Sequence, residues 1–140
     1  MSSDTPDTIT NAGGARGDKD PVVHRAFKEL TGKHAWRKVV FKTSGGPGSI
    51  EVDFNDQSFR FLIHHQERQS LRLKLKELGL LIPAAWVVMG DRKKTLLSSG
   101  LLEIVARADE RHAVEEFVYL VGREVFSWGK TRQVSARLQR

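Results

Sequence analysis

Histidines and carboxylates are the residues of this chain that could ligate a metal ion or transfer protons. Histidines stand at positions 24, 34, 64, 65 and 112, and there is no cysteine. His64 and His65 are adjacent in a strand-like segment, so their side chains point to opposite faces and do not converge on one metal ion. The HExxH spacing of zinc enzymes is absent. The sequence therefore predicts no metal site and no cofactor.

The glycine-rich stretch SGGPGS at 44–49 is the one segment that suggests phosphate binding. A phosphate-binding P-loop requires a lysine after the last glycine and a helix directly behind it. Here Ser49 follows the last glycine and a strand pattern comes next, which indicates an ordinary turn. No serine lies in a GxSxG elbow, and Glu51, Asp53, Glu115 and Glu116 occupy outward faces of the expected elements. We therefore predict no catalytic residues and no enzymatic activity.

Positive charge is the most prominent feature of the composition. The 140 residues contain 23 Lys and Arg against 17 Asp and Glu, a formal net charge of +6. Such a balance permits binding to nucleic acid, an anionic membrane or an acidic protein without choosing among them. The candidate anion-binding or nucleic-acid-binding residues are Arg92, Lys93, Lys94, Lys130 and Arg132. Sequence patterns of nucleic-acid-binding modules are missing, so a basic DNA- or RNA-binding module is the alternative function rather than the first.

The length of the chain and its local composition predict one domain with two flexible ends. Residues 1–19 are rich in Ser, Thr, Asp and Gly, which indicates a disordered leader. A single domain is expected over 20–126, and the basic tail 127–140 is expected to be flexible. Neither a secretory signal nor the roughly 18 consecutive apolar residues of a membrane-spanning helix is present, so we expect a cytoplasmic protein without membrane contact.

The hydrophobic periodicity predicts an α+β domain. Asp20-Pro21 is typical of a helix start, and Gly32 of a helix end. Three strands follow, over 36–42, 50–54 and 59–64, where apolar and polar residues alternate and short turns separate them. Consecutive strands joined by short turns predict an antiparallel meander.

The second half of the domain begins with an ambiguous segment at 67–78. Leu71, Leu73 and Leu75 alternate as in a strand, whereas Leu71, Leu75 and Leu78 share one face of a helix. The many helix-forming residues and Gly79 favour the helix. Two strands, near 86–89 and 101–108, and a C-terminal helix over 110–126 complete the expected order.

This order of helix, three-stranded antiparallel meander, helix, two strands and C-terminal helix resembles the type III secretion chaperones and the related bacterial YbjN-like peptide-binding chaperones. The passage LKELGL at 75–80, followed by Pro83 and Trp86, is similar to the link between second helix and fourth strand in that group. The REVF sequence at 123–126 is similar to the end of its closing helix. The resemblance covers residues 21–126, although members of the group are usually acidic and this chain is basic.

The resemblance implies a small homodimeric protein that binds a peptide segment of another protein without chemistry. Such binding places a peptide on apolar patches or adds a strand to an open sheet edge. The candidate partner-binding or dimer residues are Leu71, Leu75, Leu78, Phe59, Phe61 and Trp86. The sequence thus favours a protein-binding module, with nucleic-acid binding as the alternative.

Overall fold

The computed structural model describes residues 8–10, 21–33 and 35–140, and these form three α-helices and one seven-stranded antiparallel sheet. The strands are β1 Thr8–Thr10, β2 Lys38–Thr43, β3 Ser49–Phe54, β4 Ser58–His65, β5 Val87–Arg92, β6 Gly100–Arg107 and β7 Val134–Gln139. Their order across the sheet is β1-β7-β2-β3-β4-β6-β5. A mixed α and β fold is confirmed, but the expected five-stranded sheet is wrong, because β7 pairs with β2 and β1 pairs with the outer side of β7.

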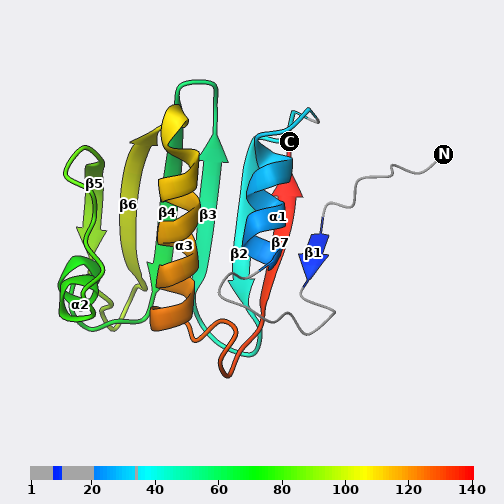
Figure 1. Ribbon diagram of the computed structural model, residues 1–140. Coiled ribbons are helices and arrows are strands. Elements are labelled where there is room, and N and C mark those ends of the chain that lie inside the picture. The colour runs from blue at the N-terminus through cyan, green and yellow to red at the C-terminus, as the bar shows by residue number, and fades with distance from the viewer. Residues whose placement is uncertain (1–7, 11–20, 34) are drawn as a thin grey trace.

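Two long helices cover one face of this sheet. They are α1, Pro21–Leu30, in front of β2 and β7, and α3, Arg111–Val125, in front of β3 and β4 (Figure 1). His24 of α1 and Glu115 of α3 join the two helices, with Nδ1 2.8 Å from Oε2. The short helix α2, Leu71–Glu77, lies near β5 at the end of the sheet (Figure 1). The opposite face of the sheet carries no helix among the described residues.

The hydrophobic core lies between the sheet and the two long helices. Apolar and polar side chains alternate along the strands, so that each strand buries one face, as Val39 and Phe41 do in β2. Phe27 of α1 lies against Phe41 and Phe59, with ring centroids 6.0 Å apart in both pairs. On the helix-free face, Lys38 of β2 pairs with Glu51 at 3.6 Å and Asp53 at 3.9 Å. The alternation seen in the sequence therefore separates a core face from a charged face.

The C-terminal segment is part of the fold. The prediction of a flexible tail over 127–140 is wrong, because Val134–Gln139 forms β7 and pairs with both β1 and β2. Val134, Ala136 and Leu138 of this strand are buried. A disordered leader was expected over 1–19, yet Thr8–Thr10 forms β1; the remainder of that range lies outside the described residues.

Trp128 fixes the connection from α3 to β7. Its side chain is buried, and its Nε1–H donates to Thr43 Oγ1 of β2 at 2.8 Å. The ring lies directly on Gly122 of α3, where an added Cβ would come within 1.9 Å of Cε3. Only glycine permits this approach of the Trp128 ring. This contact accounts for a glycine inside α3, although glycine has low helix propensity.

Candidate functional site at the edge of the sheet

The exposed apolar side chains are concentrated in one part of the molecule. Among the described residues, the large hydrophobic side chains with substantial exposure are Leu73, Leu78, Leu81, Val87, Met89, Leu96 and Leu97. All seven fall between positions 73 and 97, which comprise most of α2, the segment 78–86, β5 and the turn 93–99. We refer to residues 71–99 as the α2–β5 edge. Grouped exposed apolar side chains mark interaction sites more often than singly scattered ones do, and Leu73 and Leu81 of this set line one pocket.

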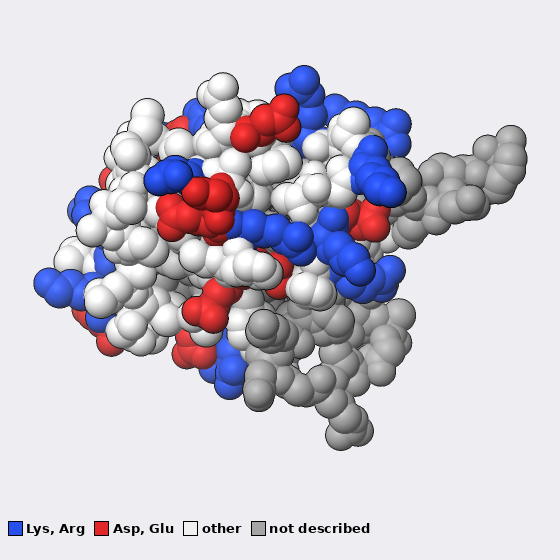
Figure 2. Space-filling model, turned by 45° about the horizontal axis from the view of Figure 1, so that its top comes forward, with Lys and Arg blue, Asp and Glu red and all other residues white. Residues whose placement is uncertain are grey.

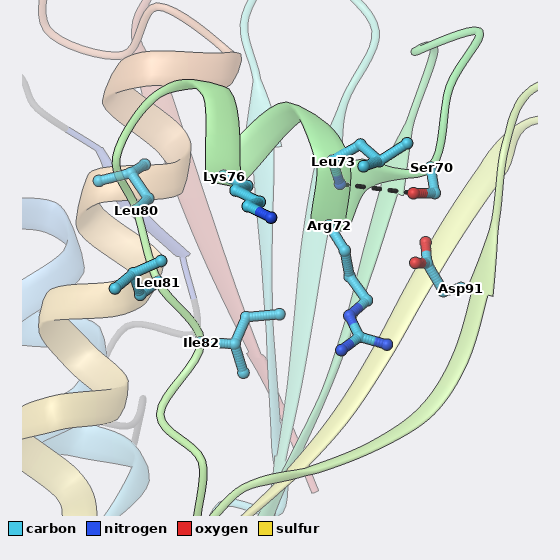
Figure 3. A pocket seen from close by; sticks show the side chains of 8 residues that line it. All are labelled: Ser70, Arg72, Leu73, Lys76, Leu80, Leu81, Ile82 and Asp91. Carbon is cyan, nitrogen blue, oxygen red and sulfur yellow. Dashed lines mark hydrogen bonds between the residues drawn. The ribbon is translucent and has the colours of Figure 1, made fainter.

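A pocket of about 400 Å³ lies within the α2–β5 edge (Figure 3). One wall is apolar and consists of Leu73, Leu80, Leu81 and Ile82, while Ser70, Arg72, Lys76 and Asp91 supply its polar groups. The α2 helix begins at Ser70, whose Oγ accepts from the Leu73 N–H at 3.4 Å. This cap, together with the buried Leu71 and Leu75, holds α2 against the sheet and so positions the side chains of its outer face.

Two cations of the pocket have no partner among the described residues. Arg72 extends from α2 into the space between Ile82 and Asp91, and the Lys76 side chain lies nearby (Figure 3). Neither Arg72 nor Lys76 has an ion-pair or hydrogen-bond partner for its side chain among the described residues. Asp91 Oδ1 is buried and has no hydrogen-bond partner there. The two cations are thus available to a ligand, whereas Asp91 Oδ1 is covered by protein atoms.

The strand β5 is an edge strand of the sheet. It pairs with β6 alone, so the backbone groups on its outer side have no strand partner among the described residues. Its register shifts between Val88 and Gly90, which places Met89 in a bulge with 60% of its surface exposed. Bulges on edge strands redirect side chains and limit uncontrolled pairing. Asp91 lies opposite the buried Leu102, so its side chain is on the helix-bearing face beside the pocket.

Five of the six candidate partner-binding residues lie in the core. Leu71, Leu75, Phe59 and Phe61 have no exposed surface and Trp86 has 5%, whereas Leu78 is 38% exposed. Trp86 packs on Phe61 and Phe117 with centroids 5.5 and 5.3 Å away, and its Nε1–H donates to Glu110 Oε2 at 3.1 Å. In this conformation only Leu78 of the six is accessible to a partner.

Sequence reasoning missed the exposed residues Leu73, Leu81, Met89, Leu96 and Leu97. Periodicity predicts which residues of an element share a face, but not which face the rest of the protein covers. One signal was available: Leu96 and Leu97 form an apolar pair within the otherwise polar turn KKTLLSS. They are 96% and 98% exposed.

The candidate anion-binding residues form two separate groups. Arg92, Lys93 and Lys94 stand at the end of β5, whereas Lys130 and Arg132 lie in the turn before β7. Four strands separate β5 from β7, a distance of roughly 24 Å at the usual strand spacing. Lys130 Nζ is 3.3 Å from Glu124 Oε2, and the Arg132 guanidinium donates to the Gly45 carbonyl. On the side shown in Figure 2, Lys and Arg are interspersed with Asp and Glu.

The two adjacent histidines have different surroundings. His64 is on the helix-free face, with Nε2 3.2 Å from Glu51 Oε2. His65 has no exposed surface, and its Nδ1 accepts from the Glu67 N–H at 3.0 Å. Burial lowers the pKa of His65 below its usual 6.5. Within residues 8–10, 21–33 and 35–140, no three His, Cys, Asp or Glu side chains are grouped to hold a metal ion.

Comparison with known proteins adds no identification. No family model matches this chain, and no curated protein or solved structure matches it. The resemblance to secretion chaperones is therefore supported by none of these comparisons. In the described part of the chain, no helix is long and apolar enough to cross a membrane.

Proposed function

We propose that this protein is a non-enzymatic module that binds another protein at the α2–β5 edge. The observation that carries the proposal is the confinement of all seven strongly exposed large hydrophobic side chains, among the described residues, to positions 73–97. Leu73 and Leu81 line a pocket, Val87 and Met89 belong to an edge strand, and both features suit the recognition of an extended peptide. Strand addition at such an edge supplies affinity through main-chain hydrogen bonds and specificity through side-chain pockets.

A relation to the secretion chaperones is part of this proposal. The elements from α1 to α3 follow the order that the resemblance implies, whereas β1, β7 and the seven-stranded sheet depart from it. Homodimerisation and a cytoplasmic location, which the sequence analysis predicts, are proposed on the same basis. A chaperone-like protein of this kind would bind its partner without cofactor or covalent chemistry.

Nucleic-acid binding is the weaker proposal. It would use Arg92, Lys93 and Lys94 together with Lys130 and Arg132, and these two groups lie next to different strands, β5 and β7, at separate places in the sheet. The Arg132 guanidinium is occupied by a backbone carbonyl, and Lys130 by Glu124. Cations with internal partners and wide separation offer less to a phosphate backbone than one continuous basic stripe does.

Site-specific photo-crosslinking tests the proposed function. A photoreactive residue at position 81 or 89 is expected to give protein adducts in extract of the source cells, and the adducts should persist after nuclease treatment. The matched controls carry the same photoreactive residue at 28 or 112, exposed positions on α1 and α3. Equal adduct yields at all four positions, or adducts that disappear with nuclease, would contradict the proposal.

A pair of aspartate substitutions separates folding from binding. Leu81→Asp replaces a side chain that is 76% exposed, so it should change the free energy of unfolding by less than about 0.5 kcal/mol while removing the adducts formed through position 89. Leu75→Asp buries an unpaired charge and should destabilise the fold by several kcal/mol. Urea unfolding measures both. Loss of stability in Leu81→Asp comparable to that in Leu75→Asp would show that Leu81 belongs to the core.

A further inference from the structure

We infer that the partner segment at the α2–β5 edge is an extended stretch of another protein in which acidic and apolar side chains are interspersed. The inference rests on the proposed function and specifies the chemistry of its ligand. Three features of the edge carry it: an apolar wall next to cations without partners among the described residues, an edge strand open on its outer side, and a net positive charge that opposes a second copy of this chain.

The pocket combines the first of these features in one small space. Leu81 and Ile82 offer apolar contact, and Arg72 extends into the space beside Ile82 (Figure 3). With no internal partner among the described residues, the Arg72 and Lys76 side chains can pair with a ligand carboxylate. A ligand that contacts the apolar wall and pairs with the cations carries an apolar side chain and an acidic group close together. Neighbouring residues of a peptide meet this condition.

The outer side of β5 adds a requirement for backbone hydrogen-bonding groups. Asp91 Oδ1 in this strand is covered by protein atoms, so the groups open to a ligand are those of the backbone on the outer side. An extended peptide carries an N–H donor at every residue except proline, and the unpaired outer side of β5 lies in the same strand as Asp91. A peptide on this edge can therefore pair with the open side of the strand.

The charge of the α2–β5 edge and its preceding loop selects against a second copy as occupant. Residues 66–97 contain seven Lys and Arg and three Asp and Glu, a net charge of +4. A twofold dimer through this edge would bring two such surfaces together, and like charges in an interface oppose association. An acidic segment of another protein is attracted instead. A segment with several acidic residues could also pair with Lys93 and Lys94, which follow β5 in the chain. A single carboxylate bound in the pocket could not pair with all of these cations.

Binding of defined peptides to the full chain tests the inference. The probe is a short fluorescent peptide that alternates Asp or Glu with Leu or Val and is blocked at both ends. Three matched peptides serve as comparisons. In the first, Ser replaces every acidic residue, and in the second, Lys replaces them. The third has the Ser sequence with a free C-terminal carboxylate. A fourth is the acidic peptide with alternate backbone nitrogens methylated. Fluorescence anisotropy measures Kd for each, and light scattering at increasing protein concentration measures self-association.

The acidic peptide is expected to bind most tightly. Methylation of its backbone should weaken binding by at least about tenfold, because strand addition requires the N–H groups. The double variant Arg72→Gln, Lys76→Gln should weaken it by roughly five- to tenfold, since partly exposed ion pairs contribute modestly. The control Arg25→Gln, Lys28→Gln makes the same charge change at exposed positions on α1 and should leave Kd unchanged.

Each contrary result overturns the inference in a recognisable way. Equal binding of the serine or lysine peptide, or an equal loss in the α1 control, shows that the edge does not select acids. Preference for the free-acid serine peptide assigns the pocket to a C-terminal carboxylate, and self-association abolished by Arg72→Gln, Lys76→Gln assigns it to a second copy. If a result other than self-association appears while the adducts at 81 and 89 persist, the proposed function stands and only its ligand chemistry is wrong. Assignment of the edge to a second copy contradicts the proposed function as well. If the adducts are also missing, both fail.

Discussion

His65 is a buried base whose protonation the fold opposes. Its ring has no exposed surface, and Gly100 leaves room for it, since a Cβ there would come within 2.1 Å of Cε1. Nδ1 accepts a backbone hydrogen bond, and Nε2 is buried without a partner among the described residues. A charged imidazolium at this place would lose hydration, and its Nδ1–H would face the Glu67 N–H. Burial therefore keeps the pKa of His65 below 6.5.

We expect this histidine to make the fold less stable in acid. In the unfolded chain His65 takes up a proton near pH 6.5, whereas in the folded chain it does so only at lower pH. Above pH 6.5 His65 therefore does not reduce the free energy of unfolding. Below pH 6.5 that free energy falls progressively as the pH is lowered. A single proton limits this slope to about 1.4 kcal/mol per pH unit. Urea unfolding between pH 7.5 and 5.0 measures it.

The variant His65→Gln isolates that contribution. It should be less stable than the parent at pH 7.5 and show a shallower loss between pH 7.5 and 5.0. His112→Gln changes an exposed histidine and should leave the slope as it is in the parent. A slope unaffected by His65→Gln would mean that other groups account for the acid sensitivity.

At the scale of elements, β7 connects the end of the chain to the middle of the fold. It pairs with β2 over six residues and with β1 over three, and it turns Val134, Ala136 and Leu138 towards the core. Removing the strand would leave the edge of β2 unpaired and uncover the core beneath α1. The C-terminal strand is therefore expected to contribute to global stability rather than to fray.

A matched pair of substitutions in β7 tests its role. Ala136→Asp places a carboxylate at a fully buried position and should destabilise the protein by about 3 kcal/mol or more. Ser135→Asp introduces the same group one residue earlier, on the helix-free face opposite Lys42, and should change stability by less than about 0.5 kcal/mol. Chemical unfolding followed by circular dichroism measures both. Equal, small effects would mean that β7 is detached in solution.

At the scale of the whole molecule, the net charge of +6 is dispersed rather than gathered in one basic stripe. Cations of the helix-free face pair with neighbouring acids, as Lys38 does with Glu51 and Arg60 with Glu103. The exposed Arg92 and Lys93 and the half-buried Lys94 are far from the turn that carries Lys130 and Arg132. Dispersed cations attract polyanions weakly and without sequence preference.

Affinity for duplex DNA should accordingly stay in the ordinary non-specific range of about 10⁻⁴–10⁻⁶ M at physiological salt. Replacing Arg92, Lys93 and Lys94 by Ala should lower the slope of log K against log salt by up to about three, because each lost phosphate contact removes about 0.9. Titration of labelled DNA at several salt concentrations measures both quantities. Submicromolar, salt-sensitive binding would favour the nucleic-acid alternative over the protein-binding proposal.

Local patterns in the sequence determined the elements between Pro21 and Val125. Alternation and periodicity are properties of consecutive residues, so α1, the strands β2 to β4 and α3 could be predicted near their observed positions. The 67–78 ambiguity was decided for a helix by residue type and Gly79, and α2 occupies Leu71–Glu77. The charged face of the meander was likewise visible in the alternation of Glu51 and Asp53 with apolar residues.

Only the tertiary structure decided what those elements cover and leave open. The tail contains the alternation of Val134, Ala136 and Leu138, but its place beside β2 depends on a pairing nearly one hundred residues away along the chain. The predicted partner residues Leu71 and Leu75 are apolar in the sequence for the same reason as the exposed Leu73 and Leu81, and packing alone separates the two pairs. Burial depends on contacts between distant segments, whereas a sequence pattern reports only the periodicity within one segment, so the core and the candidate site could not be told apart before the chain was folded.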